Sequence, residues 1–133
     1  MVRVGTVEIA RTGRALRLCE TASPPTWYLP WADVQRDAFV PAPGSSHCEW
    51  KGRAAYWSIV AGGQRLDGIA WSYPDAVAPF AALQDCVALY PSRGANCFVD
   101  DVLVTGQPGG FYGGWITPEL VGPWKGGPGT SGW

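Results

Sequence analysis

The sequence predicts a single, mainly β domain with a small antiparallel fold. Short stretches in which apolar and polar residues alternate are separated by glycines and prolines, which is the pattern of strands joined by turns. The 18 glycines and 12 prolines supply many turns, while 8 tryptophans, 5 tyrosines and 4 phenylalanines supply a core. We therefore expect one domain over residues 1–133, with a β-rich core at 1–104 and a Gly/Pro/aromatic-rich tail at 105–133 that packs on it.

The first part of the chain reads as strands. A hairpin is expected over residues 2–9, because Gly5-Thr6 suits a tight type II′ turn. Residues 14–20 alternate as a strand does, and residues 26–29, which lie between prolines, are predicted to form a short edge strand. Residues 32–39 fit one or two helical turns.

The second part continues the pattern. Residues 54–61 are apolar on both faces, which predicts a central strand, and Gly62-Gly63 marks a hairpin with a return strand at 64–72. The remaining elements are a short helix at 77–83, a strand at 86–90 and a hairpin at 96–104 around Asp100-Asp101.

Charge and cysteine spacing argue against several classes of protein. The net charge of -1 and a pI of about 5.7 provide no field that gathers nucleic acid or an anionic membrane, so we expect neither as a partner. No apolar run has the length of a membrane span or a secretion signal, and we expect a cytoplasmic protein. The four cysteines are too widely spaced for a disulfide framework or a zinc site, so we expect reduced thiols and neither metal nor cofactor.

Chemistry-bearing residues are densest at 46–58. Lys51-Gly52 is predicted to form a turn, and we expect the segment 47–57 to thread through the middle of a sheet. His47 and Glu49 share one face of a strand, and Lys51 follows two residues later, so these three are candidates for acid-base work on a bound molecule. The alternative is a solvated strand face with ion pairs. Cys48 points to the other face, as a nucleophile or, in the simpler interpretation, a buried structural thiol.

Aromatic residues surround these groups in the sequence. Indole and phenol rings form walls that stack on planar ligands and attract cations, although most tryptophans serve only as core. The candidate ligand-binding aromatics are Trp50, Tyr56, Trp57, Trp71 and Tyr73.

Several stretches together resemble the bacterial domain-of-unknown-function family numbered 427, in particular its actinobacterial members. They are RALRLCET (14–21), PPTWYLP (24–30), CEWKG (48–52), AWSYP (70–74), VALYP (87–91) and, in the tail, GGFYGGW (109–115) and GGPG (126–129).

The resemblance implies a small antiparallel fold akin to the Mss4-like or β-tent group. Zinc-binding members of that group use two C-x-x-C pairs, and this chain has neither. The family pattern also places Arg17 and Glu20 beside Lys51, which makes them candidate ligand-binding residues. The family's label hints at nucleotidyl transfer, but the sequence contains no phosphate-binding Gly-rich loop and no paired-Asp metal site.

These observations predict a cytosolic protein that binds a small molecule in an aromatic-lined pocket, or a small metal-independent enzyme. A hydrolase, isomerase or lyase would use Glu49 or His47 as base and Lys51 or Arg17 to stabilise an anion. The alternative is a non-catalytic interaction module or homodimer that uses exposed aromatics. Single-stranded nucleic acid would require a basic groove beside the rings.

Overall fold

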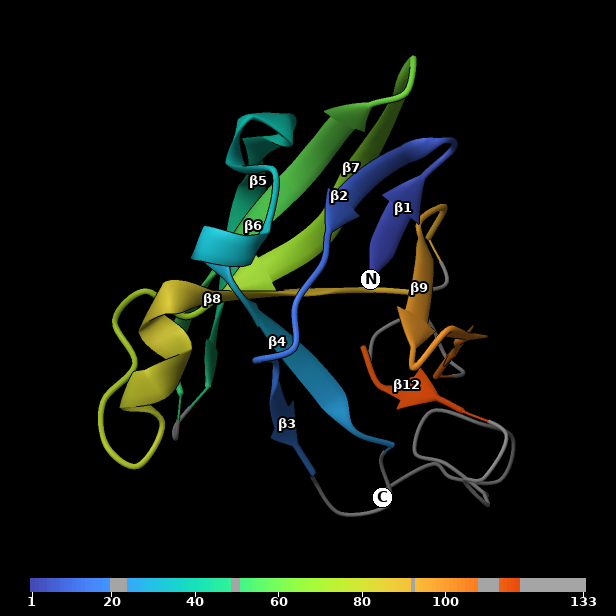
Figure 1. Cartoon of the computed structure of the whole chain (residues 1–133). Helices are drawn as coiled ribbons and strands as arrows, with labels where there is room; N and C mark the ends of the chain where they lie inside the picture. The colour runs from blue at the N-terminus through green and yellow to red at the C-terminus, as the bar shows by residue number, and fades with distance from the viewer. Residues whose placement is uncertain (20–23, 49–50, 92, 108–112, 118–133) are drawn as a thin grey trace, which may run out of the picture.

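The computed structural model describes residues 1–19, 24–48, 51–91, 93–107 and 113–117 (Figure 1). Within these ranges the protein is mainly β, and every pair of neighbouring strands is antiparallel. The strands form a six-stranded, a four-stranded and a two-stranded sheet. The predicted fold class is confirmed at this level, whereas the likeness to the Mss4-like group stays a prediction.

The six-stranded sheet has the order β3-β4-β8-β7-β6-β5. Its strands are β3 (Leu16–Leu18), β4 (Thr26–Pro30), β5 (Phe39–Cys48), β6 (Gly52–Ala61), β7 (Gln64–Ser72) and β8 (Cys86–Leu89). The β6-β7 turn is the predicted Gly62-Gly63, with φ of +58° and +74°. The prediction that residues 26–29 form an edge strand was wrong, because β4 pairs with both β3 and β8. Its prolines lie at or beyond the strand ends, where a missing N–H disrupts little of the ladder.

The four-stranded sheet has the order β10-β9-β1-β2 and lies over one face of the larger sheet (Figure 1). Its strands are β1 (Val2–Val4), β2 (Val7–Ala10), β9 (Asn96–Val99) and β10 (Val102–Leu103), and the two-stranded sheet joins β11 (Thr105–Gly106) to β12 (Trp115–Ile116). Both predicted hairpins are confirmed. Gly5 has φ +58° between β1 and β2, and Asp100 and Asp101 turn the chain between β9 and β10.

The helical segments in the described part of the chain are three short 3₁₀ turns. They are η1 (Trp31–Asp33), η2 (Arg36–Ala38) and η3 (Ala81–Asp85). The first two confirm the helical turns predicted at 32–39, and η3 lies later than predicted but buries Leu83 as expected. None of the helices described is long and apolar enough to cross a membrane.

Two apolar clusters cover opposite faces of the six-stranded sheet. The first packs β1, β2 and β9 against residues such as Leu29 and Ile59, and it includes Trp115. The second contains Tyr28 and Trp71 and is covered by the segment that leads through η3. Because successive strand residues point to opposite faces, Tyr28 and its neighbour Leu29 belong to different clusters.

Candidate functional site

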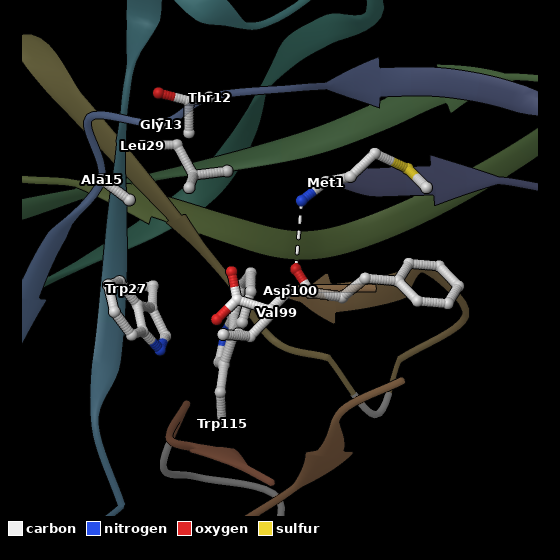
Figure 2. Close-up of a pocket in the computed structure, with 10 residues that line it drawn as sticks. Met1, Thr12, Gly13, Ala15, Trp27, Leu29, Val99, Asp100 and Trp115 are labelled. Carbon is white, nitrogen blue, oxygen red and sulfur yellow. Dashed lines mark hydrogen bonds between the residues drawn. The ribbon is translucent and has the colours of Figure 1, made fainter. Parts of the chain in front are cut away.

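A cleft of about 230 Å³ opens where the first cluster reaches the surface (Figure 2). Trp27 and Leu29 come from β4, Phe98 and Val99 from β9, and Trp115 from β12. The other residues that line it are Met1, Thr12, Gly13, Ala15 and Asp100. Most of these residues are apolar and two carry indoles, but polar atoms, including one carboxylate, make up nearly as much of the cleft surface as apolar ones.

Local structure fixes the two indoles. Trp27 and Leu29 are two residues apart on β4, so both side chains point to the same face of the sheet. Trp115 is only 2% exposed, its backbone N–H donates to the Pro25 carbonyl at 2.8 Å, and its indole Nε1 donates to the Leu89 carbonyl at 3.1 Å. These bonds hold Trp115 in place whether or not a ligand is present.

Asp100 enters the cleft from the tight turn between β9 and β10. Asp100 and Asp101 have φ of +49° and +65°, a left-handed conformation that aspartate tolerates better than most residues other than glycine. In the view of Figure 2 the Asp100 carboxylate points toward Trp27. Within the described ranges this carboxylate has neither a hydrogen bond nor an ion pair.

The Met1 amine is the second charged group at the cleft. It donates to the Phe98 carbonyl at 3.1 Å, as the dashed line in Figure 2 shows. Burial is the main cause that lowers the pKa of this amine below its usual 8.0. The amine is thus directed at a backbone carbonyl.

The loop between β2 and β3 is held by an ion pair outside the cleft. The Thr12 hydroxyl donates to Asp33 Oδ2 at 2.7 Å, and Arg14 binds Asp33 Oδ1 at 2.8 Å. Hydrogen bonds from Arg14 and Thr12 lower the pKa of the Asp33 carboxyl. Thr12 is therefore oriented by Asp33, and this contact supports the wall that Gly13 and Ala15 form.

The sequence-predicted catalytic residues lie at the β5-β6 turn. The structure describes only the backbone of His47 and Cys48, which pair with Arg53 and Gly52, and Glu49 lies outside the described residues. Lys51 is in the turn, 9% exposed, with its Nζ 5.4 Å from the centre of the Tyr73 ring. The prediction that the segment 47–57 threads the middle of a sheet holds for residues 52–57, which lie on the inner strand β6, and was wrong for residues 47–48, which lie on the edge strand β5. The turn between them is the one predicted at Lys51-Gly52.

The predicted ligand-binding residues are divided between the two faces of the large sheet. Tyr56 is opposite Trp71 in the β6-β7 register and shares the second cluster with it and with Tyr73. Trp57 is opposite Ala70 on the other face, so one pocket cannot hold both Trp57 and Trp71. Of the remaining three, Arg17 lies on β3, opposite Trp27 of β4. Trp50 and Glu20 lie outside the described residues.

The second-cluster aromatics pack mainly on one another. The Trp71 ring lies 4.6 Å from Tyr90 and edge-on to Tyr28 at 6.4 Å, and its Nε1 donates to the Tyr28 hydroxyl at 3.4 Å. The Tyr56 and Ser46 hydroxyls are 2.7 Å apart. Trp71 and Tyr73 are 8% and 9% exposed, so this group is largely core, and any functional role stays a prediction.

Sequence reasoning missed the three residues that define the cleft, Trp27, Asp100 and Trp115. The sequence held a local signal for two of them. Trp27 lies next to Tyr28 on a predicted strand, where the two side chains must point to opposite faces, and Asp100 begins a predicted turn. Nothing in the sequence near residue 115 indicates which strand it packs against. Among the described residues, no group of three or more histidines, cysteines and acids is placed to hold a metal ion.

Two comparisons with known proteins bear on the chain. The model of a family described as a domain of unknown function, DUF427, matches residues 1–103. No curated protein matches. The family match thus includes Trp27 and Asp100 and ends before Trp115.

Proposed function

The chain belongs to the domain-of-unknown-function family DUF427, and from this premise we propose that it is a cytoplasmic small-molecule-binding protein whose site is the cleft between Trp27 and Trp115. A concave site with apolar walls and a few polar groups is the usual form of a ligand pocket. Its 230 Å³ is below the roughly 300–1,000 Å³ of pockets for drug-sized molecules, so the ligand is a small metabolite.

The observation that carries this proposal is an open cleft with an indole already locked in its wall. Trp115 is fixed by two hydrogen bonds to the protein, so its ordering cost is met during folding and not during binding. Trp27, the half-buried indole of the cleft, supplies apolar ring surface with little rotamer freedom, and Trp115, 2% exposed, forms a rigid backing. These features favour binding of an apolar or aromatic group.

Binding is a better description of this cleft than catalysis. Among its described lining residues there is one carboxylate side chain, Asp100, and neither histidine nor lysine. Lys51, from the predicted acid-base set, packs on Tyr73 in the opposite cluster. Among the described residues, the charged groups at the cleft are Asp100 and the Met1 amine, and the amine is engaged with the Phe98 carbonyl.

A fragment screen tests the proposal. The full chain, labelled with ¹⁵N, is titrated with small aromatic and aliphatic compounds while the indole N–H signals are followed, with Trp27→Phe and Trp115→Phe used for assignment. We expect binders to shift the signals of Trp27 and Trp115 and to leave that of Trp71 unchanged. Shifts confined to Trp57 or Trp71, or no shifts at all, would contradict the assignment of the site.

A truncation of one wall measures its contribution. Trp27→Leu should weaken a binder about fivefold, because an aromatic contact contributes roughly 1 kcal/mol beyond burial. Trp57→Leu is the matched control, since Trp57 is also half-buried in the first-cluster packing but does not line the cleft. Equal weakening in the two variants would indicate a general effect on the fold.

A further inference from the structure

We infer that the ligand of this cleft is an organic cation, an amine or ammonium with an apolar body, whose charge is held by the Asp100 carboxylate. The inference rests on the proposed function, because it names the ligand class for the same site. Three features carry it: the unpaired state of Asp100, the indole walls, and the direction of the Met1 amine.

Asp100 has neither a hydrogen bond nor an ion pair within the described residues, as is true of several exposed acids, but it is the acidic side chain that lines the cleft. Glu8 pairs with Arg11 at 2.7 Å, Asp33 with Arg14 at 2.8 Å, and Asp67 with Arg65 at 2.7 Å. Asp100 also stands in a left-handed backbone conformation and lines the cleft. A carboxylate in this setting is complementary to a cation that brings its own donors.

The walls favour the same charge. The face of an indole ring attracts an ammonium group within about 6 Å of its centre, and tryptophan does so more strongly than other aromatics. Trp27, which is half-buried, lines the cleft that Asp100 borders, whereas Trp115 is 2% exposed and offers a ligand little ring surface. A cation thus meets an attractive carboxylate and the Trp27 ring, whereas an anion meets repulsion from Asp100.

The Met1 amine is the one charge at the cleft that opposes a cation among the residues described. It is directed at the Phe98 carbonyl at 3.1 Å, which offsets part of its charge. Asp101 and Glu8 also act on it with negative charge. The amine is therefore already partnered, while the Asp100 carboxylate is not.

Three probes with one carbon skeleton separate charge from shape. Phenethylamine, phenethyl alcohol and phenylacetate are titrated into the full chain by calorimetry, with the Trp27 and Trp115 indole signals as the site readout. We expect phenethylamine to bind at least tenfold more tightly than the alcohol, and phenylacetate to bind most weakly. Equal affinity for amine and alcohol would overturn the inference and leave the proposed function intact, since both would still occupy the cleft. Failure of all three to bind would overturn the inference, and the fragment screen then decides the proposed function separately.

Two neighbouring substitutions assign the charge to one residue. Asp100→Asn should reduce the preference for amine over alcohol to within about twofold. Asp101→Asn makes the same change at the adjacent residue and should keep the preference for amine over alcohol, because Asp101 does not line the cleft. Asparagine also tolerates positive φ, so both variants should fold, which the melting temperature checks. A preserved preference in Asp100→Asn, or an equal loss in both, would refute the role of Asp100.

Discussion

Cys97 shows how burial of one group links stability to pH. Its side chain is 0% exposed in the first cluster, opposite Val2 on β1. Burial raises the pKa of the thiol from 9.0 to about 12, because the thiolate would lose its hydration. Above the unfolded pKa, the folded protein therefore retains a proton that the unfolded chain releases.

Because the unfolded chain releases this proton and the folded protein does not, we predict that the free energy of unfolding falls in alkali, partly through Cys97. The loss begins near the unfolded pKa of 9.0 and amounts to at most about 1.4 kcal/mol per pH unit up to the folded pKa of about 12. Urea unfolding at about pH 8 and about pH 10 measures it. Burial also raises the pKa of Cys86 and Tyr90, so these groups contribute to the same loss of stability in alkali. The contribution of Cys97 is therefore obtained by comparing wild type with cysteine variants. Cys97→Ala should show a smaller loss than wild type, and Cys19→Ala, at an exposed site, should not; equal losses in all three would be contrary evidence.

The turn at Asp101 gives a second prediction at this scale. A left-handed conformation costs a residue with a Cβ roughly 1–2 kcal/mol, and glycine avoids this cost. With φ of +65°, Asp101→Gly should be about 1 kcal/mol more stable to urea than Asp101→Ala. Equal stability of the two variants would mean that the turn relaxes to another conformation.

At the scale of elements, the segment that leads into β12 packs against Trp71 because Gly113 has no side chain. A Cβ built on Gly113 would lie 2.1 Å from Cη2 of Trp71, whose ring is confined by Tyr90 and Tyr28. The close approach of the segment at residue 113 to Trp71 therefore requires glycine. Steric space, and not backbone conformation, is thus the reason for glycine at position 113.

We predict that Gly113→Ala lowers the free energy of unfolding by about 1–3 kcal/mol, the usual cost of overpacking a core. Gly13→Ala is the control, because a Cβ there meets nothing within 4 Å, and it should change stability by less than about 0.5 kcal/mol. Urea unfolding compares the two. A neutral Gly113→Ala would show that Trp71 or the segment moves aside at little cost.

Elements were predictable where local chemistry sets them. The turns at Gly5-Thr6, Gly62-Gly63 and Asp100-Asp101 followed from residues that accept positive φ between alternating stretches. The edge position of β5 was not predictable, because alternation continues on both sides of the turn that precedes β6 and gives no sign of which strand lies at the edge.

At the scale of the whole molecule, the core extends past the segment that matches the family. Trp115 is 2% exposed and packs in the first cluster, twelve residues beyond the end of the match at residue 103. Its indole also donates to Leu89 on the central strand β8. The described residues 113–117 are therefore part of the folded unit.

This arrangement predicts a large cost for removing Trp115. Trp115→Ala should destabilise the protein by about 3–5 kcal/mol, as for other large aromatics in cores. Trp115→Phe, which keeps much of the ring but loses the N–H, should cost less. Thermal and urea unfolding of both variants check the order. A change below about 1 kcal/mol in Trp115→Ala would mean that this segment packs loosely.

The cleft itself depends on contacts that no local pattern reveals. Trp27, Asp100 and Trp115 are far apart in the sequence and meet because β4 pairs with β8 and β9 pairs with β1. The predicted ligand-binding aromatics lie on both faces of the six-stranded sheet for the same reason. Tyr56 and Trp57 are neighbours on one strand, so their side chains must point to opposite faces. The sequence predicted an aromatic-lined pocket around residues 46–58, whereas the cleft lies elsewhere and contains none of the predicted aromatics.

A crystal structure of the full chain grown with phenethylamine tests the central claim most directly. We expect the ring of the amine to lie in the cleft between Trp27 and Trp115, with its nitrogen within hydrogen-bond distance of the Asp100 carboxylate. An empty cleft with the amine bound elsewhere, or an amine in the cleft whose nitrogen points away from Asp100, would contradict the account.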